Sequence, residues 1–279
     1  MEILWDYRVV LDLFLGGVGI GAFLFATILY VVDAKKFQVG IRKSWIVAPI
    51  LIILGLVLLL TELGRPLNII KAIYHTNGSS VMSIGMFLQG ICVALMLLVV
   101  YKLYTSKIEE ISKSLIYITG LFAGLVGIYH GFLLTGIERL AWTDSIPSMF
   151  FISSILAGSA LSTVFMVSEE GYKELMTKLK LPIIFNLVLT FQIISVFSWV
   201  YSLAIRGSET KLVYDELMST FSFEFQFFVI VGIVIPLVLF TQMIVKKTNT
   251  KALFTVATAC IIAGSLMMKY IVVYIGQMV

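Results

Sequence analysis

Charged residues are scarce in this sequence, and so are the residues that build disulfides and metal sites. Aspartate, glutamate, lysine and arginine make up 13% of the 279 residues, and there are only two cysteines and two histidines. Cys92 and Cys260 lie in apolar segments with no second cysteine or histidine at ligand spacing. This argues against a disulfide framework or an iron-sulfur site, and we expect both cysteines to be packing residues.

The motifs of nucleotide-binding and hydrolytic enzymes are also missing. The chain has no Gly-rich phosphate loop, HExxH, CxxC or Ser/His/Asp arrangement. Two stacked bis-histidine haems would need four histidines, whereas only His75 and His130 exist, so we expect no haem and no other metal. The net charge of +4 does not indicate a nucleic-acid partner, because the basic residues gather in short segments between apolar runs.

Apolar residues are what the sequence has in excess. They make up 60% of the chain and the mean hydropathy is +1.04, whereas a soluble domain has about 45–50% apolar residues. The apolar runs are about 20 residues long and lack the alternation of a membrane β-barrel. We therefore predict an all-α integral membrane bundle of about eight transmembrane helices, forming one transmembrane domain over residues 1–279.

The apolar runs also predict where the spans lie. Glu2 and Asp6 stand where a signal peptide would be basic, so we expect the first helix to be retained. Pro236 is the only proline that we expect deep inside a span. The predicted spans are 9–32, 45–63, 81–104, 114–137, 147–168, 182–205, 223–245 and 251–277.

Lysine and arginine are distributed unequally between the two sides of these spans. One side collects 13 of them and the other 6. Basic residues favour cytoplasmic loops, so we expect both termini to be extracytoplasmic. The richer side has Lys35, Lys36, Arg42, Lys43, Lys102, Lys107, Lys113, Lys173, Lys178, Lys180, Lys246, Lys247 and Lys251; the other has Arg8, Arg65, Lys71, Arg139, Arg206 and Lys211.

This orientation places the unusual polar residues in the outer half of the bundle. Asp12 lies early in the first span, Glu62 ends the second, Glu224 begins the seventh, and Lys269 lies in the last third of the eighth. The stretch from Tyr129 to Glu138, at the end of the fourth span, carries a phenol, an imidazole and a carboxylate. Ionisable groups inside a membrane are costly, and they commonly mark functional sites.

Other local features allow a structural explanation. Gly17 and Gly21 form a GxxxG pattern, which is typical of close helix packing. Glu62 and Arg65 could form an interfacial ion pair. Residues 210–218 could form a short amphipathic helix that lies at the interface or docks a partner. Tyr129 could likewise belong to an interfacial aromatic belt, and His130 could be a packed histidine.

A quinone is a ligand that suits these polar groups. Its site needs an apolar slot, donors for two carbonyl oxygens and a group that exchanges protons. Tyr129 or His130 could bond a carbonyl. The acids that could pass protons to the outer water are Asp12, Glu62, Glu138 and Glu224.

Six segments occur in an order that is typical of one membrane protein family. They are Phe14–Phe23, Glu62–Pro66, Ser79–Gly85, Tyr129–Leu134, Gly232–Pro236 and Lys269–Gln277. With them the chain resembles the NrfD/PsrC family, the membrane subunits of polysulfide-reductase-like complexes of anaerobic respiration. It departs from the family pattern at Glu62, where aspartate is more common, at His130, where a small residue is usual, and at Lys269, where arginine is usual.

The resemblance implies a haem-free subunit that passes electrons between membrane menaquinol and an extracytoplasmic, ferredoxin-like iron-sulfur subunit. That subunit would serve a molybdopterin or multihaem cytochrome enzyme. The protein would then supply a quinol-oxidising or quinone-reducing site without being the terminal catalytic subunit. The family tyrosine that bonds the quinone matches Tyr129, and polar first-helix positions match Arg8 and Asp12. We expect catalytic roles for Tyr129, His130, Asp12 and Glu62, and cofactor contacts from Tyr129, Arg8, Asp12, Arg65 and Gly17.

Two other functions are compatible with the sequence. In an ion or proton-coupled transporter, Lys269, Glu224 and Glu62 would form a relay, although no inverted repeat or polar cluster at the membrane midplane supports this. A purely structural anchor for an extracytoplasmic complex would use its acids as interfacial ion pairs and bind no quinone.

Overall fold

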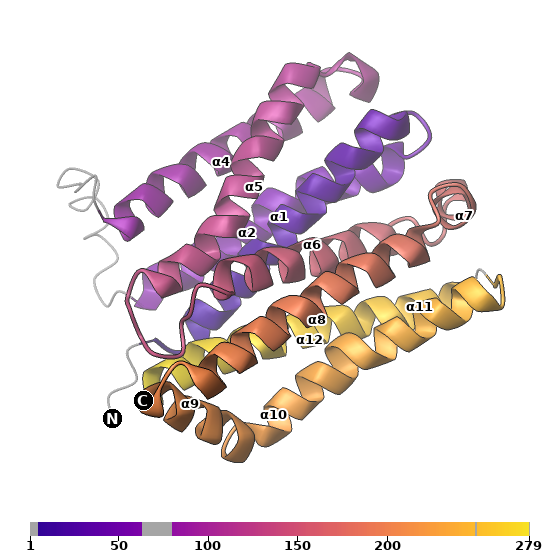
Figure 1. Ribbon diagram of the computed structural model, residues 1–279. Coiled ribbons are helices and arrows are strands. Elements are labelled where there is room, and N and C mark those ends of the chain that lie inside the picture. Colours follow the sequence, from indigo (N-terminus) through magenta and orange to yellow (C-terminus); the bar gives the residue numbers. More distant parts are fainter. Residues whose placement is uncertain (1–4, 63–79, 249, 279) are drawn as a thin grey trace.

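The computed structural model is all-helical in the residues that it describes, which are 5–62, 80–248 and 250–278. Eight helices in these ranges are long and apolar enough to cross a membrane, so the protein is a multi-pass membrane protein. They form one elongated bundle (Figure 1). The spans are α1 (Tyr7–Asp33), α2 (Gln38–Glu62), α4 (Val81–Thr105), α5 (Lys113–Thr135), α6 (Ile146–Val164), α8 (Leu181–Ile205), the continuous α10 (Ser222–Phe227), η2 (Phe228–Val234) and α11 (Ile235–Val245), and α12 (Lys251–Met278).

The predicted spans are confirmed, and most of their ends lie within a few residues of the observed ones. The main error is α2, which begins at Gln38 and not at residue 45. Its first turns carry charged and polar side chains, which hydropathy alone counts against a span. Because α2 starts earlier, Pro49 lies well inside it, so our prediction of Pro236 as the only such proline was wrong.

Helix α1 forms the centre of the bundle. Over its most apolar window 78% of the residues are buried, compared with 28% for the peripheral α4. Its main neighbours are α2 and α6. At Gly21 a Cβ atom would overlap the backbone of Ser154, and one at Gly158 would overlap the backbone of Gly21. The predicted packing role of the α1 glycines is therefore confirmed at the α1–α6 contact.

The seventh span changes its helical form near its middle. Its segment η2 is a π-helix, and Pro236 follows in the first turn of α11. Proline cannot donate a backbone hydrogen bond, so one carbonyl of the preceding turn loses its usual partner. The wider turn brings Gly232 against Gly264 of α12, where either glycine would clash if it had a Cβ. Such π-turns are often retained at functional positions.

The two ends of the bundle differ in what they carry. The start of α1 and the end of α12 lie at one end, here called the terminal end, together with the short helix α9 (Ser208–Ser219) (Figure 1). The short helix α7 (Glu170–Thr177) and the turn between α1 and α2 lie at the opposite end. Helix α9 confirms the helix expected around residues 210–218. Which end faces the cytoplasm stays a prediction from the basic residues.

Candidate functional site

A cluster of polar residues at the terminal end joins the segment before α1 to α2 and α12. We call it the terminal rim: Trp5, Asp6, Arg8, Glu62 and Gln277. The Asp6 backbone N–H donates to Glu62 Oε1 at 3.1 Å, and the Arg8 guanidinium contacts Asp6 Oδ2 at 2.8 Å. The backbone N–H of Trp5 donates to Gln277 Oε1 at 2.7 Å, and Gln277 Nε2 donates to the Trp5 carbonyl at 2.9 Å. These bonds hold the rim together and leave Glu62 Oε2 as its one buried oxygen without a partner among the described residues.

Asp6 also caps the first transmembrane helix. Its carboxylate accepts a hydrogen bond from the backbone N–H of Arg8 at 2.7 Å, which satisfies a free donor of the first turn. The hydrogen bond from the Arg8 side chain lowers the pKa of the Asp6 carboxyl below its usual value. Arg8 also donates to the Thr61 carbonyl at 2.8 Å, so it joins α1 to the end of α2.

One turn deeper, Asp12 lies at the contact between α1 and α2. It is only 3% exposed, and a Cβ on Gly55 of α2 would lie 2.7 Å from Asp12 Oδ1. Asp12 makes no hydrogen bond or ion pair with another described residue. It lies in the neighbourhood of Glu62 and Tyr129. A carboxylate buried in this way needs a partner or a proton.

Tyr129 reaches the same region from α5. Its side chain lies against Gly85 of α4, where a Cβ atom would overlap the phenol ring. Tyr129 is 9% exposed and makes no hydrogen bond to another described residue. A lipid-facing tyrosine of an aromatic belt would be exposed, so the structure does not support that explanation. Tyr129 and Asp12 instead lie among α1, α2, α4 and α5.

His130 points from α5 towards the glycines of α1. It is 1% exposed, and a Cβ on Gly16 would lie 2.8 Å from its Cε1 atom. Its Nε2 lies 3.0 Å from Gln89 Nε2 of α4, so the amide donates when the imidazole carries its proton on Nδ1. The buried Nδ1 has no partner among the described residues. His130 is thus packed but only partly satisfied.

Lys269 enters the same level of the bundle from α12. Its side chain is fully buried, with Nζ 3.1 Å from Ser265 Oγ and 3.5 Å from Ser153 Oγ of α6. Nζ also lies 5.4 Å from the centre of the Phe150 ring. A Cβ on Gly17 would lie 3.5 Å from Lys269 Cε. The ion pairs within the described ranges give Lys269 no carboxylate partner.

These residues form one layer across the bundle. We call it the buried polar layer: Gln89, His130, Ser153, Ser265 and Lys269. It separates two apolar clusters: on α1, Leu13 belongs to one and Val18 to the other, with Gly16 and Gly17 between them. Small residues at this level let polar side chains from α5 and α12 approach α1 closely.

The structure sorts the expected site residues into three groups. Asp12, Tyr129 and His130 are buried near one another, and Glu62 lies above them in the terminal rim with one buried oxygen, Oε2, unbonded. Arg8 is engaged by Asp6 and Thr61, and Gly17 faces α6 and Lys269. Arg65 lies outside the described residues, as does His75, so the predicted Glu62–Arg65 pair has no structural description.

The sequence interpretation missed Gln89 and the two serines of the layer. Gln89 is a single amide inside an otherwise apolar span, which is the signal that marks an intramembrane polar site. Ser153 and Ser265 gave no such signal, because serine is common in helix contacts and hydroxyls can bond to their own helix. Among the described residues, no group of three or more histidine, cysteine or acidic side chains could hold a metal ion.

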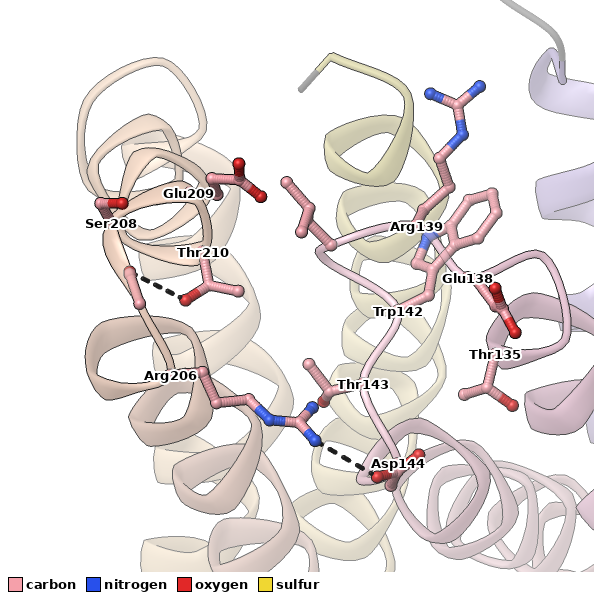
Figure 2. A pocket seen from close by; sticks show the side chains of 12 residues that line it. Thr135, Glu138, Arg139, Trp142, Thr143, Asp144, Arg206, Ser208, Glu209 and Thr210 are labelled. Carbon is pink, nitrogen blue, oxygen red and sulfur yellow. Dashed lines mark hydrogen bonds and ion pairs between the residues drawn. The ribbon is translucent and has the colours of Figure 1, made fainter.

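Two pockets lie apart from this layer. The larger, about 510 Å³, opens at the terminal end between the α5–α6 and α8–α9 connections (Figure 2). Its walls carry charges of both signs, including Glu138, Arg139 and an Arg206–Asp144 ion pair of 3.5 Å. The smaller, about 330 Å³, is almost wholly apolar and lies between α1, α5 and α6 around Gly21 and Gly120. Neither includes a residue of the buried polar layer.

Eight spans with a glycine-rich helix at their centre, and with ionisable side chains buried between them, define a polytopic membrane protein with an intramembrane polar site. The family model described as "Polysulphide reductase, NrfD" matches residues 1–279, and the chain belongs to this family.

Individual relatives agree with this assignment. The sequence is 23% identical to "Protein NrfD" of Escherichia coli K12 over 310 residues, covering 99% of this protein and 96% of the relative. It is 30% identical to the C subunit of the polysulfide reductase of Wolinella succinogenes over 177 residues, or 56% of each protein. The "Protein NrfD homolog" of Haemophilus influenzae is 23% identical over 317 residues, covering 99% of this protein and 95% of the relative.

Proposed function

We propose that this protein is the quinol-binding membrane subunit, built as a single transmembrane domain, of a respiratory oxidoreductase complex. It exchanges electrons between membrane menaquinol and an extracytoplasmic iron-sulfur subunit, which passes them to or from a molybdopterin or multihaem cytochrome subunit. Membership of the NrfD family supports the class, since one relative is the C subunit of a polysulfide reductase. The proposed site lies among α1, α2, α4 and α5.

The observation that carries this proposal is the convergence of Asp12, Tyr129 and His130. All three side chains are buried, and the buried His130 Nδ1 has no hydrogen-bond partner among the described residues. Buried polar groups are nearly always satisfied, so an unpaired imidazole nitrogen beside a buried carboxyl and a buried phenol indicates a ligand that bonds it. A quinol, with a flat apolar body and two oxygens, has the required chemistry.

The three side chains then have distinct roles. The Tyr129 hydroxyl donates a hydrogen bond to one oxygen of the substrate and orients it. Asp12 takes a proton when quinol is oxidised, or His130 Nδ1 does so in the tautomer whose Nε2–H donates to the Gln89 amide oxygen. Glu62, at the end of α2, passes the proton towards the water at the terminal end. Arg8 holds Asp6 and the Thr61 carbonyl in place from the rim, and it reaches a ligand only by leaving its pair with Asp6. The same groups run in reverse for quinone reduction.

The partner subunits would dock at the terminal end. This end carries the 510 Å³ pocket with its mixed charges, and the basic-residue distribution predicts that it is extracytoplasmic. Helix α9 leaves Leu212 and Met218 exposed beside this end, which suits contact with a partner or the membrane interface. An iron-sulfur subunit docked here would lie close to the proposed quinol site.

The transporter alternative has less support from the structure. Lys269, Glu224 and Glu62 would need to form a relay, but the salt bridges of the described residues do not join any two of them. Lys269 is instead held by two serine hydroxyls of α6 and α12.

Replacement of Tyr129 by phenylalanine tests the site. In the complex purified from native membranes, Y129F should lower quinol oxidation at least about 100-fold, because the orienting hydrogen bond is lost while the ring still packs on Gly85. The matched control is Y201F at an exposed position, which should leave the rate unchanged. Normal turnover of an intact Y129F complex would refute the assignment. Absence of iron-sulfur and molybdenum or haem subunits from the wild-type preparation would refute the proposed complex.

A further inference from the structure

Lys269 is the least expected side chain in the bundle. Its residue is 0% exposed, it lies in a membrane-spanning helix, and none of the ion pairs in residues 5–62, 80–248 and 250–278 involves it. Charged groups at such depth are normally paired with an opposite charge. The surroundings of Nζ therefore decide what this side chain does.

These surroundings are suited to an ammonium group. An ammonium has three donors and no acceptor, and the groups around Nζ offer what such a group needs. Two hydroxyl oxygens, of Ser265 and Ser153, lie at 3.1 and 3.5 Å and can accept its hydrogen bonds. The two hydroxyls also bond each other at 2.8 Å, which fixes their positions. The face of the Phe150 ring lies at 5.4 Å, within cation–π range.

The ammonium also lies close to the residues of the proposed site. Gly17, against which Lys269 Cε packs, is five residues after Asp12 on α1, or about 7.5 Å along the helix axis. Gly16, the residue before it, faces the His130 imidazole, which lies 2.8 Å from where a Cβ would be. Lys269 and His130 thus lie against adjacent residues of α1. No aspartate or glutamate of the described ranges is paired with Lys269, so its field is not cancelled locally.

We propose that Lys269 is a positioning residue that supplies a buried positive charge to the quinol site. This inference rests on the proposed function. The charge stabilises the deprotonated hydroxyl of a bound quinol and disfavours a second positive charge on His130. The proton released by the substrate is thereby directed to Asp12 rather than to the imidazole. No bond is made to Lys269, and its proton stays on Nζ.

The size of the effect follows from Coulomb's law. A unit charge that lies roughly 10 Å from a bound anion, in a medium of effective dielectric constant about 20, changes the affinity for that anion by roughly tenfold. Removal of the charge should therefore weaken binding of an anionic quinol analogue about tenfold. The pH at which quinol oxidation reaches half its maximal rate should rise by about one unit, because the substrate hydroxyl ionises less readily.

The test measures binding as well as turnover in the purified complex. The probe is a hydroxyquinoline N-oxide, a quinol analogue with an ionisable hydroxyl, and its binding is followed by fluorescence quenching across pH. K269M should lose about tenfold affinity for the anionic form and little for the neutral form, whereas K269R should keep the wild-type pH profile. The matched control is K211M, which removes the same charge from an exposed position and should not change the profile.

Each failure has a separate meaning. If wild-type complex neither binds the analogue nor oxidises quinol, the proposed function fails. If wild type binds it and K269M binds the anion equally well, the role of Lys269 is refuted. Should K269M be missing from the membrane, S265A removes the closer acceptor of the ammonium. It should weaken anion binding in the same direction, and an unchanged affinity would overturn the inference.

Discussion

The terminal rim and the buried polar layer both bring polar side chains together from distant helices, but they complete their hydrogen bonds differently. In the rim, Asp6 pairs with Arg8, and Gln277 bonds the Trp5 backbone twice. In the layer, His130 Nδ1 has no partner and Lys269 has no carboxylate among the described residues. Paired groups at a helix end stabilise the fold, whereas unpaired groups deep in the bundle cost stability and indicate a function.

The difference also shows why α1 is rich in glycine. The rim needs no close helix contact, because its side chains are long and lie at the helix ends. The layer needs room beside Gly16 and Gly17 for His130 and Lys269, and it needs α1 and α6 to touch at Gly21 and Gly158. The same central helix therefore supports a hydrogen-bonded polar cluster at its end and, in its interior, a cluster with unpaired groups for which we propose a function.

The largest expected effect comes from separating α1 and α6. G158A places a Cβ inside the backbone of Gly21, which cannot move aside as a flexible side chain could. We expect a loss of about 3 kcal/mol or more in stability and little folded protein in the membrane. The control is G124A, because Gly124 has no neighbouring atom within 4 Å of the added methyl. Equal thermal melting of the two variants in detergent would show that the layer does not depend on this contact.

The next effect concerns the pairing of Gln89 with His130. Q89L should cost about 1–3 kcal/mol, since it leaves a second buried imidazole nitrogen unbonded. The double variant with H130L should regain part of that stability, because both polar partners are then gone. Quinol oxidation should nevertheless fall about 100-fold or more whenever His130 is absent, because the substrate then loses its hydrogen bond to the imidazole Nδ1.

The hydrogen bonds of Gln277 in the terminal rim serve as the comparison for the Gln89–His130 pair. Q277L should lower stability by leaving the Trp5 backbone groups unbonded, yet keep wild-type turnover. Melting curves and turnover of the same preparations separate the two outcomes. If Q277L loses turnover as strongly as H130L, the distinction between rim and layer is wrong.

The smallest effect concerns Asp6 and pH. Because the Arg8 hydrogen bond lowers the pKa of Asp6 in the folded protein, its stabilising contribution is complete above the unfolded pKa of about 3.9. It is lost as the pH falls through the lower, folded value. The pair is about a third exposed, so D6N should cost less than about 1 kcal/mol between pH 5 and 8, with no pH dependence in that range. A D6N difference in melting that changes between pH 5 and 8 would contradict this.

Most of the fold could be predicted from the sequence because span formation is a local property. Each span is a run of apolar residues long enough to cross a membrane, and hydropathy sums over neighbours in the chain. The start of α2 was predicted too late because its first turns carry charged and polar residues, which lower the hydropathy. Pro49 was therefore not recognised as a proline well inside a span. The π-helical turn before Pro236 was not predicted, since it depends on contact with Gly264.

The candidate site was predicted only in part. Asp12, Tyr129 and His130 were recognisable as ionisable or polar groups in apolar runs, and the structure brings them near one another. Gln89, Ser153 and Ser265 were missed, because an isolated amide or serine acquires meaning only through its neighbour on another helix. Arg8 was expected to contact a ligand, and the structure shows it bound to Asp6 and Thr61; its ligand contact stays a prediction.

The sequence by itself determined the membrane class, the eight spans, the family resemblance and the prominence of Tyr129 and Lys269, because each depends on residue type and order along the chain. Only the tertiary structure decided that His130 faces Gly16, that Asp12 meets Gly55, and that two serines hold Lys269. Those contacts depend on how far each helix is rotated and how deep it lies relative to its neighbours. Inside a membrane, hydropathy does not specify the rotation or the depth of a helix. Close packing of small and polar residues specifies both.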